Sequence, residues 1–322
     1  MCWVSPTASS LNSKNEGWYE PVTNPDSVII TDVALRDGLQ NHAAVVLTDA
    51  KMDLVDLLVD AGVKSIEVGS FVHPVLLPQM ADAEEIYRRL PEAPEITFSS
   101  LVPNLRGAQR AIAAGAKDVR LVLSVSEGHS KSNTNRTVAE GIAETAQAVA
   151  LLREAGDIKI TGSLATAFVC PFDGVVPVSQ LEWVVGSLVE MGLEEISLAD
   201  TLGKADPETF ERTVAAMRST FPAVTFELHI HNTYGMGLAH VSAGLRQGVR
   251  RFDAALGGIG GCPFAPGAAG NIATEDIAFM LQLMDVETGI DLEKLAVAAE
   301  HLRTVMGVPL ESSISRALGW VA

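Results

Sequence analysis

The chain has few cysteines, few aromatic residues and no long apolar run. Its three cysteines, Cys2, Cys170 and Cys262, lie far apart and form no CxxC pair. This spacing argues against a disulfide scaffold and favours a reducing, cytoplasmic setting. No apolar run approaches the roughly 20 residues that a membrane helix needs, and the N-terminus lacks the basic and apolar regions of a secretory signal. We therefore expect no membrane partner.

Positive charge is also scarce. The sequence has 23 Lys and Arg residues against 40 Asp and Glu residues, which gives a formal net charge of −17. Such an acidic protein is a poor match for nucleic acid or an anionic membrane surface. An anionic small molecule stays compatible, because one site can be locally basic. With 322 residues, 48% of them hydrophobic, the chain can bury a large aliphatic core.

Residues 1–26 show no alternation of strand-like and helix-like stretches. We interpret them as an N-terminal extension outside the fold. It is either a flexible tail or an arm that docks on the body or on a neighbouring subunit through Trp3, Trp18 and Tyr19. Residues 27–322 contain no linker or low-complexity segment, so we predict that they form a single catalytic domain.

From residue 27 onward, short β-branched runs alternate with longer Ala-, Leu- and Glu-rich stretches of helical spacing. The predicted strands are residues 27–35, 65–71, 96–103, 118–126, 158–166, 194–201, 226–233 and 251–260. A helical stretch follows each one, at a repeat of roughly 30 residues, which indicates parallel βα units.

Eight such units predict an α/β protein, a (β/α)₈ TIM barrel, with additional helices at the C-terminal end. The main alternative is an open, doubly wound sheet. That fold favours a GxGxxG phosphate turn after its first strand, and "ALRDGLQN" (34–41) has none.

Unusual polar residues gather at the predicted carboxyl ends of the strands, where barrel enzymes place their active sites. This set comprises Arg36, Asp37, Glu67, Asp200, His229, His231, Cys262 and Asn271. Because they come from five of the eight strands and the segments that follow them, we predict one site on one rim.

The pair His229 and His231 has the spacing of metal ligands. Side chains two positions apart lie on the same face of a strand. If that face is the barrel interior, two imidazoles can bind one divalent cation with Asp37 as an oxygen ligand. An HxH pair alone is weak evidence, because isolated histidines usually pack in cores or lie on surfaces. The nearby acidic residues favour the metal site, and this donor set suits Mg²⁺ or Mn²⁺.

Arg36 and Glu67 each have an ordinary explanation. Arg36 could form a surface ion pair with Asp37, the usual outcome for such neighbours. At a barrel mouth, its guanidinium could instead stabilise a developing oxyanion. Glu67 could partner a cation or histidine inside the barrel, which would support the site indirectly.

Cys262 lies in the glycine-rich stretch "GGIGGCPFAPGAAGN" (257–271). So many glycines are typical of a mobile or closely approached loop, and a cysteine at its tip could act as acid or base. A lone cysteine is more often a small apolar residue, and we interpret Cys2 and Cys170 in that way.

Together these residues resemble the 3-hydroxy-3-methylglutaryl-CoA lyases, in the barrel metalloenzyme group that also contains isopropylmalate and homocitrate synthases. The matching stretches are residues 35–41, 66–80, 196–203, 229–240 and 257–276. The likeness runs from about residue 27 to about residue 305. The cysteine loop distinguishes the lyases from the synthases.

The resemblance implies cleavage of 3-hydroxy-3-methylglutaryl-CoA into acetyl-CoA and acetoacetate, as in leucine degradation. We also expect a homo-oligomer. It implies a Mg²⁺ or Mn²⁺ site made by Asp37, His229, His231 and Asn271. Arg36 would stabilise the enolate oxygen, and Cys262 would be the catalytic cysteine on a closing loop. Glu67 and Asp200 would organise the site or handle protons, and the ligand His229 also counts among the catalytic residues.

Departures from the family pattern leave the substrate open. The chain has Ala34 and Leu35 where relatives often have Gly-Pro, and Asn232 where they usually have Asp. The stretch "HPVLL" (73–77) is also unusual for a lyase. The alternatives are another 3-hydroxy-3-alkylglutaryl-CoA, a related branched hydroxyacyl-CoA, a synthase-type acyltransferase reaction, or a non-catalytic metal-binding role.

Overall fold

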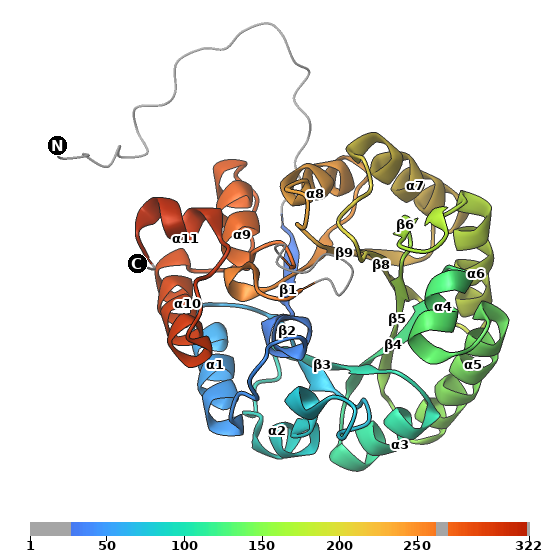
Figure 1. Cartoon of the computed structure of the whole chain (residues 1–322), viewed down its shortest axis with the longest axis horizontal. Helices are drawn as coiled ribbons and strands as arrows, with labels where there is room; N and C mark the ends of the chain where they lie inside the picture. Colours follow the sequence, from blue (N-terminus) through green and yellow to red (C-terminus); the bar gives the residue numbers. More distant parts are fainter. Residues whose placement is uncertain (1–26, 262–269, 321–322) are drawn as a thin grey trace, which may run out of the picture.

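A computed structural model describes residues 27–261 and 270–320. Eight parallel strands close into a barrel in the order β1-β10-β9-β8-β5-β4-β3-β2, and helices surround this ring (Figure 1). The predicted TIM barrel is therefore confirmed. The N-terminal extension, residues 1–26, lies outside the described residues.

Each of the eight predicted strand ranges overlaps one strand of the barrel. The strands are β1 (Ile29–Asp32), β2 (Ser65–Ser70), β3 (Thr97–Val102), β4 (Asp118–Ser124), β5 (Lys159–Ala165), β8 (Glu195–Asp200), β9 (Thr225–Ile230) and β10 (Arg251–Ala254). Two short strands, β6 (Val169–Cys170) and β7 (Gly174–Val175), form a separate antiparallel pair between β5 and the next helix.

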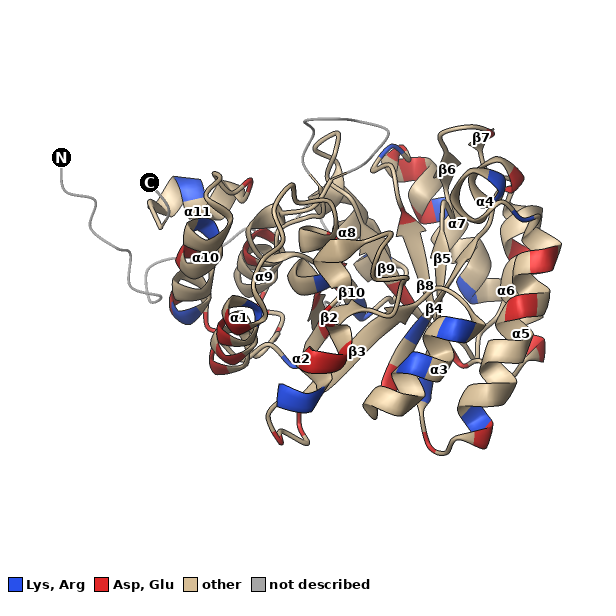
Figure 2. Cartoon of the chain, turned by 60° about the horizontal axis from the view of Figure 1, so that its bottom comes forward, with Lys and Arg blue, Asp and Glu red and all other residues tan. Residues whose placement is uncertain are grey.

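The helices lie outside the strands, as the tilted view in Figure 2 also shows. They are α1 (Thr48–Asp60), α2 (Ala83–Arg89), α3 (Leu105–Ala114), α4 (Glu127–Thr134), α5 (Val138–Glu154), α6 (Val178–Glu190), α7 (Pro207–Thr220), α8 (Gly237–Arg246), α9 (Thr274–Leu283), α10 (Leu292–Met306) and α11 (Ser313–Leu318). The last three follow β10 and include the predicted C-terminal helices. Within the described ranges, no helix is long and apolar enough to span a membrane.

The core lies between strands and helices because strand side chains alternate in direction. In β2, Ile66 and Val68 belong to the same buried cluster as Val55 and Leu58 of α1. Glu67 lies between them and points the other way, into the barrel. The inward positions of several strands are polar, and they build the site described below.

Two elements that line the candidate site, each directly after a barrel strand, were not predicted. The turn after β1 is a short π-helix, η1 (Ala34–Gly38), and the segment after β4 is the helix α4, where we expected a loop. Helix α4 lacks an apolar stripe of helical period, and η1 is too short to have one, so periodicity could reveal neither. Both carry side chains that line the candidate site.

Candidate active site

Asp37, His229 and His231 meet inside the carboxyl end of the barrel. One ligand atom from each residue lies within 4.8 Å of the others, and all three residues are buried. The two histidine Nε2 atoms are 3.1 Å apart, and His231 Nε2 is 3.5 Å from Asp37 Oδ2. The two-residue spacing at the end of β9 puts both rings on one face, as predicted. The structure shows that this face is the barrel interior.

Asn271 joins this group from the segment after β10. Its backbone forms a bridge with His231, and its Nδ2 donates hydrogen bonds to Asp37 Oδ2 (2.7 Å) and Ile259 O (3.2 Å). Its Oδ1 is buried and finds no hydrogen-bond partner among the described residues. Because a buried carbonyl oxygen without a partner is costly, this atom fits a cation ligand.

Arg36 lies at the edge of the group and connects it to Glu67. Its Nε donates to Glu67 Oε2 at 2.9 Å, and its Nη1 donates to Asp37 Oδ1 at 2.5 Å. Burial alone would raise the pKa of Asp37, but Arg36 and His231 hold that pKa well below its usual range. Asp37 therefore presents an ionised carboxylate at neutral pH, as a cation ligand must.

Asp253 of β10 fixes the orientation of His229. Its Oδ2 lies 3.0 Å from His229 Nδ1, and burial lowers the pKa of His229 below its ordinary value. A neutral ring that donates from Nδ1 to a carboxylate presents the lone pair of Nε2 to the group. Asp253 was not predicted, although a charge within a predicted strand is the same signal that identified Glu67.

Asp200 ends β8 but does not join the group. Its carboxylate accepts hydrogen bonds from the backbone N–H groups of Lys204 and Ala205, both at 3.2 Å. Its Oδ2 also lies 3.7 Å from His240 Nδ1. Burial raises the pKa of Asp200 to about 6. The structure thus places Asp200 where it holds the loop after β8, behind the wall of the site.

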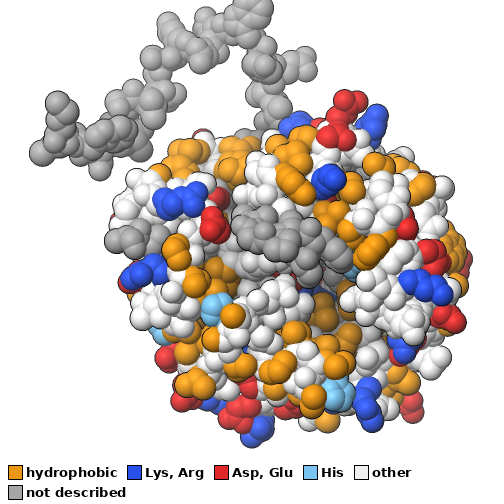
Figure 3. Space-filling view, in the orientation of Figure 1, with side chains coloured by type: hydrophobic (Ala, Val, Ile, Leu, Met, Phe, Trp, Pro, Cys, Tyr) orange, Lys and Arg blue, Asp and Glu red, His pale blue; other side chains and the backbone are white. Residues whose placement is uncertain are grey.

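A cavity of about 340 Å³ opens directly over the buried group, and Figure 3 shows that this face of the molecule is hollowed near its centre. The lining of the cavity includes Arg36, Asp37, His229 and His231. Other lining residues come from α4 and from the segments after β1, β8 and β10, namely Gln40, Asn41, His129, Ser132, Asn133, Thr201 and Gly261. The predicted catalytic Cys262 follows Gly261 directly but lies outside the described residues. Its position in the site stays a prediction.

Glycine is required where the glycine-rich stretch passes beside Asn271. Gly260 has a φ of +126°, and a Cβ there would lie 2.7 Å from Asn271 Nδ2. This is the close backbone approach that the composition of the stretch predicted.

Comparison with known proteins identifies the family of the chain. The family model described as HMGL-like matches residues 27–302. The chain belongs to this family. It is 42% identical to the (R)-citramalyl-CoA lyase of Chloroflexus aurantiacus, over 91% of this chain and 95% of that protein.

Solved structures give the same relationship. The crystal structure of the Bacillus subtilis HMG-CoA lyase matches with a TM-score of 0.89 and 37% identity, over 92% of this chain and 99% of that one. An HMG-CoA lyase from Acinetobacter baumannii, in complex with coenzyme A and 3-methylmalate, matches with a TM-score of 0.85 and 39% identity, over 91% and 95% of the two chains. The protein is thus an enzyme of the HMGL-like family, a lyase that cleaves carbon–carbon bonds.

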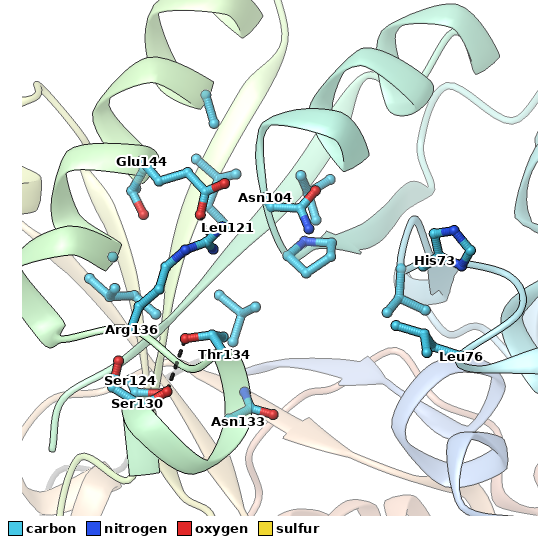
Figure 4. Close-up of a pocket in the computed structure, with 18 residues that line it drawn as sticks. His73, Leu76, Asn104, Leu121, Ser124, Ser130, Asn133, Thr134, Arg136 and Glu144 are labelled. Atoms are coloured by element: carbon cyan, nitrogen blue, oxygen red, sulfur yellow. Dashed lines mark hydrogen bonds and ion pairs between the residues drawn. The ribbon is translucent and has the colours of Figure 1, made fainter. Parts of the chain in front are cut away.

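A second cavity of about 330 Å³ lies on the other side of α4 and shares Val122 and Asn133 with the first. Figure 4 shows its lining, with the hydrogen bond from Thr134 Oγ1 to the Ser130 carbonyl in α4. Arg136 pairs here with Glu144 of α5. The short helix α4 thus forms a wall between the two cavities.

Proposed function

We propose that this lyase uses a divalent cation, Mg²⁺ or Mn²⁺, to cleave 3-hydroxy-3-methylglutaryl-CoA into acetyl-CoA and acetoacetate. One observation carries the proposal. Asp37, His229, His231 and the unpartnered oxygen of Asn271 converge beside Arg36 under one open cavity. The similarity to HMG-CoA lyases over most of the chain supports the same reaction.

The donor set suits the proposed cation. Two imidazole nitrogens, a carboxylate and an amide oxygen would hold it, which is a hard and mainly oxygen–nitrogen environment. Such an ion lowers the pKa of a hydroxyl group that it coordinates. The tertiary hydroxyl must lose its proton before the C2–C3 bond can break.

The position of Arg36 supports a role in the second half of the reaction. Bond cleavage sends an electron pair towards the thioester and leaves an acetyl-CoA enolate. The Arg36 guanidinium, held by Glu67 at 2.9 Å, offers fixed positive charge for that oxyanion. Carbon protonation then needs an acid, which we assign to Cys262. For Asp200, the loop contacts described above favour a positioning role.

A second substrate deserves a direct test because a relative at 42% identity is an (R)-citramalyl-CoA lyase. Citramalyl-CoA has the same tertiary hydroxyl and methyl group, but its carboxylate arm is one methylene shorter. One methylene is worth only about 1–3 kcal/mol in a pocket, so the same catalytic residues could serve either molecule. Cleavage would then release pyruvate in place of acetoacetate.

The test incubates the purified full chain with each thioester and measures acetyl-CoA, acetoacetate and pyruvate. We expect acetoacetate release from 3-hydroxy-3-methylglutaryl-CoA with added Mg²⁺ or Mn²⁺, and none with excess chelator. Pyruvate release alone would move the assignment to citramalyl-CoA. Metal-independent turnover, or no turnover of any hydroxyacyl-CoA, would contradict the proposal.

Cys262→Ser separates a lyase from a passive metal-binding protein. The lyase should lose turnover and keep its bound metal, because Cys262 is not among the proposed ligands. Unchanged turnover in the variant would remove Cys262 from the mechanism. Assembly into a homo-oligomer and a cytoplasmic location stay predictions, to be checked by light scattering and by cell fractionation.

A further inference from the structure

A second buried polar cluster lies deeper in the barrel, near the amino ends of the strands. We call it the floor cluster, and it consists of Arg120 of β4, Glu227 of β9 and Asp253 of β10. All three residues are at most 5% exposed. Glu227 lies two positions before His229 on β9 and therefore points to the same inner face.

Arg120 is the centre of this cluster. Its Nη1 pairs with Glu227 Oε1 and lies 3.2 Å from Asp253 Oδ2. Its Nε donates to Ser99 Oγ at 3.3 Å, and its Nη2 lies 3.5 Å from Thr31 Oγ1. The guanidinium is thus held by side chains from four other strands around the barrel.

Asp253 Oδ2 is the link between the floor cluster and the active site. This oxygen accepts hydrogen bonds from Arg120 Nη1 at 3.2 Å and from His229 Nδ1 at 3.0 Å. The position of this carboxylate therefore fixes the rotation of the His229 ring. It also determines that Nε2, and not Nδ1, faces Asp37 and His231. A change at Arg120 must reach His229 through this shared atom.

Stability alone is a weak reason for such a cluster. Burying an arginine with two carboxylates costs desolvation energy that their attraction barely offsets, and apolar residues of similar volume often do as well. The floor cluster makes better sense as support for a precisely oriented ligand, because partners of metal-bound histidines strongly affect metal binding.

We propose that Arg120 is a positioning residue for the cation site. It holds Asp253, and Asp253 holds His229 with Nε2 turned towards Asp37 and His231. This inference rests on the proposed function, since it assumes that the group around His229 binds a divalent cation.

The test measures Mn²⁺ binding to the full chain by the EPR signal of free Mn²⁺, with no substrate present. The double variant Arg120→Met/Glu227→Met removes the cation and its main partner together and keeps the volume filled. We expect its Mn²⁺ dissociation constant to rise by roughly 10- to 100-fold, while circular dichroism shows a folded protein. Binding within twofold of the unmodified protein would overturn the proposal.

Asp253→Asn tests the same route with a change of almost no volume. Its amide has no negative charge with which to hold Arg120 Nη1 and His229 Nδ1 at one oxygen, so we expect a loss of Mn²⁺ affinity in the same range. Unchanged affinity in this variant would equally overturn the route from Arg120 through Asp253. This second variant decides the matter if the double variant does not fold.

Lys51→Met is the matched control. Lys51 is 1% exposed and donates to Asp82 Oδ1 (2.6 Å) and Gln79 O (2.7 Å), outside the barrel interior. We expect its Mn²⁺ affinity to stay within twofold of the unmodified protein, and a tenfold loss would show that any lost buried cation has this effect. Failure of the unmodified protein to bind Mn²⁺ would instead refute the proposed function.

Discussion

The two ends of the barrel interior hold polar groups in opposite ways. At the floor, Arg120 lies among the carboxylates of Glu227 and Asp253 and supplies a cation from the chain itself. At the rim, ligand atoms of Asp37, His229 and His231 lie within 4.8 Å of one another. Arg36 supplies the only guanidinium among the residues that line this cavity, and it lies to one side of the three ligands.

The difference teaches how to recognise a site in a polar interior. Both ends are buried and both contain two carboxylates and one arginine. At the floor the arginine fills the centre and pairs with both carboxylates. At the rim the donors face one another, and Asn271 Oδ1 has no partner within the described part of the chain. Such convergence indicates a ligand from outside.

Removing a rim ligand should have the largest effect. In His231→Ala we expect Mn²⁺ binding to be lost and turnover to fall by roughly 10³-fold or more, since the cation would supply several kcal/mol to the reaction. Mn²⁺ titration and steady-state kinetics measure both. The control is His301→Ala, at a half-buried histidine of α10, which should change neither. If His231→Ala keeps both its bound Mn²⁺ and its turnover, the rim is not a cation site, and the proposed difference between rim and floor is wrong.

At the floor, single and double substitutions should differ in stability. Arg120→Met leaves two buried carboxylates without their cation and should lower the free energy of unfolding by about 3–5 kcal/mol. Arg120→Met/Glu227→Met should recover most of that loss, because only one of the carboxylates then remains. Denaturant unfolding of both variants checks this. Equal stability of the single variant and the unmodified protein would mean that the floor cluster is not electrostatically coupled.

Arg36→Lys should separate chemistry from metal binding at the rim. A lysine keeps the charge but loses the planar fork that contacts Glu67 and Asp37. We expect kcat to fall by about 10²–10³-fold, as for other oxyanion donors, with Mn²⁺ still bound. Arg110→Lys is a fair control, since Arg110 also forms a partly buried pair, with Glu84 at 2.6 Å. A normal kcat in Arg36→Lys would exclude Arg36 as the oxyanion partner.

A smaller effect concerns another buried carboxylate, that of Glu275 in α9, which forms no ion pair with any described residue. Burial raises the pKa of Glu275 to about 8 from the ordinary 4.5. The folded protein keeps a proton there that the unfolded chain releases, so this contribution to stability is full below pH 4.5 and is lost as the pH rises towards 8.

Glu275→Gln should therefore reduce the fall in melting temperature between pH 5.5 and pH 8.5, by roughly 2 °C or more. Thermal unfolding at the two pH values measures the change. An identical pH dependence in variant and unmodified protein would show that Glu275 ionises normally in the folded state.

The sequence predicted the barrel well because period and repeat are local signals. It also predicted that His229 and His231 share a face, since that follows from their spacing alone. It could not orient Asp200, because a residue at a strand end faces either side. The register settles this, since Asp200 pairs with Ile230 and not with the inward His229. Asp253 carried the same signal as Glu67, a charge within a predicted strand, but its contact with Arg120 could not be predicted because it crosses the barrel, over 133 residues of chain.

The most direct test of the difference between rim and floor is a crystal structure of the protein with Mn²⁺, using the anomalous signal of the ion. The account predicts one strong peak within ~2.5 Å of donor atoms of Asp37, His229, His231 and Asn271, and none at Arg120. A peak elsewhere, or none at saturating Mn²⁺, would contradict the claim that the rim is a cation site.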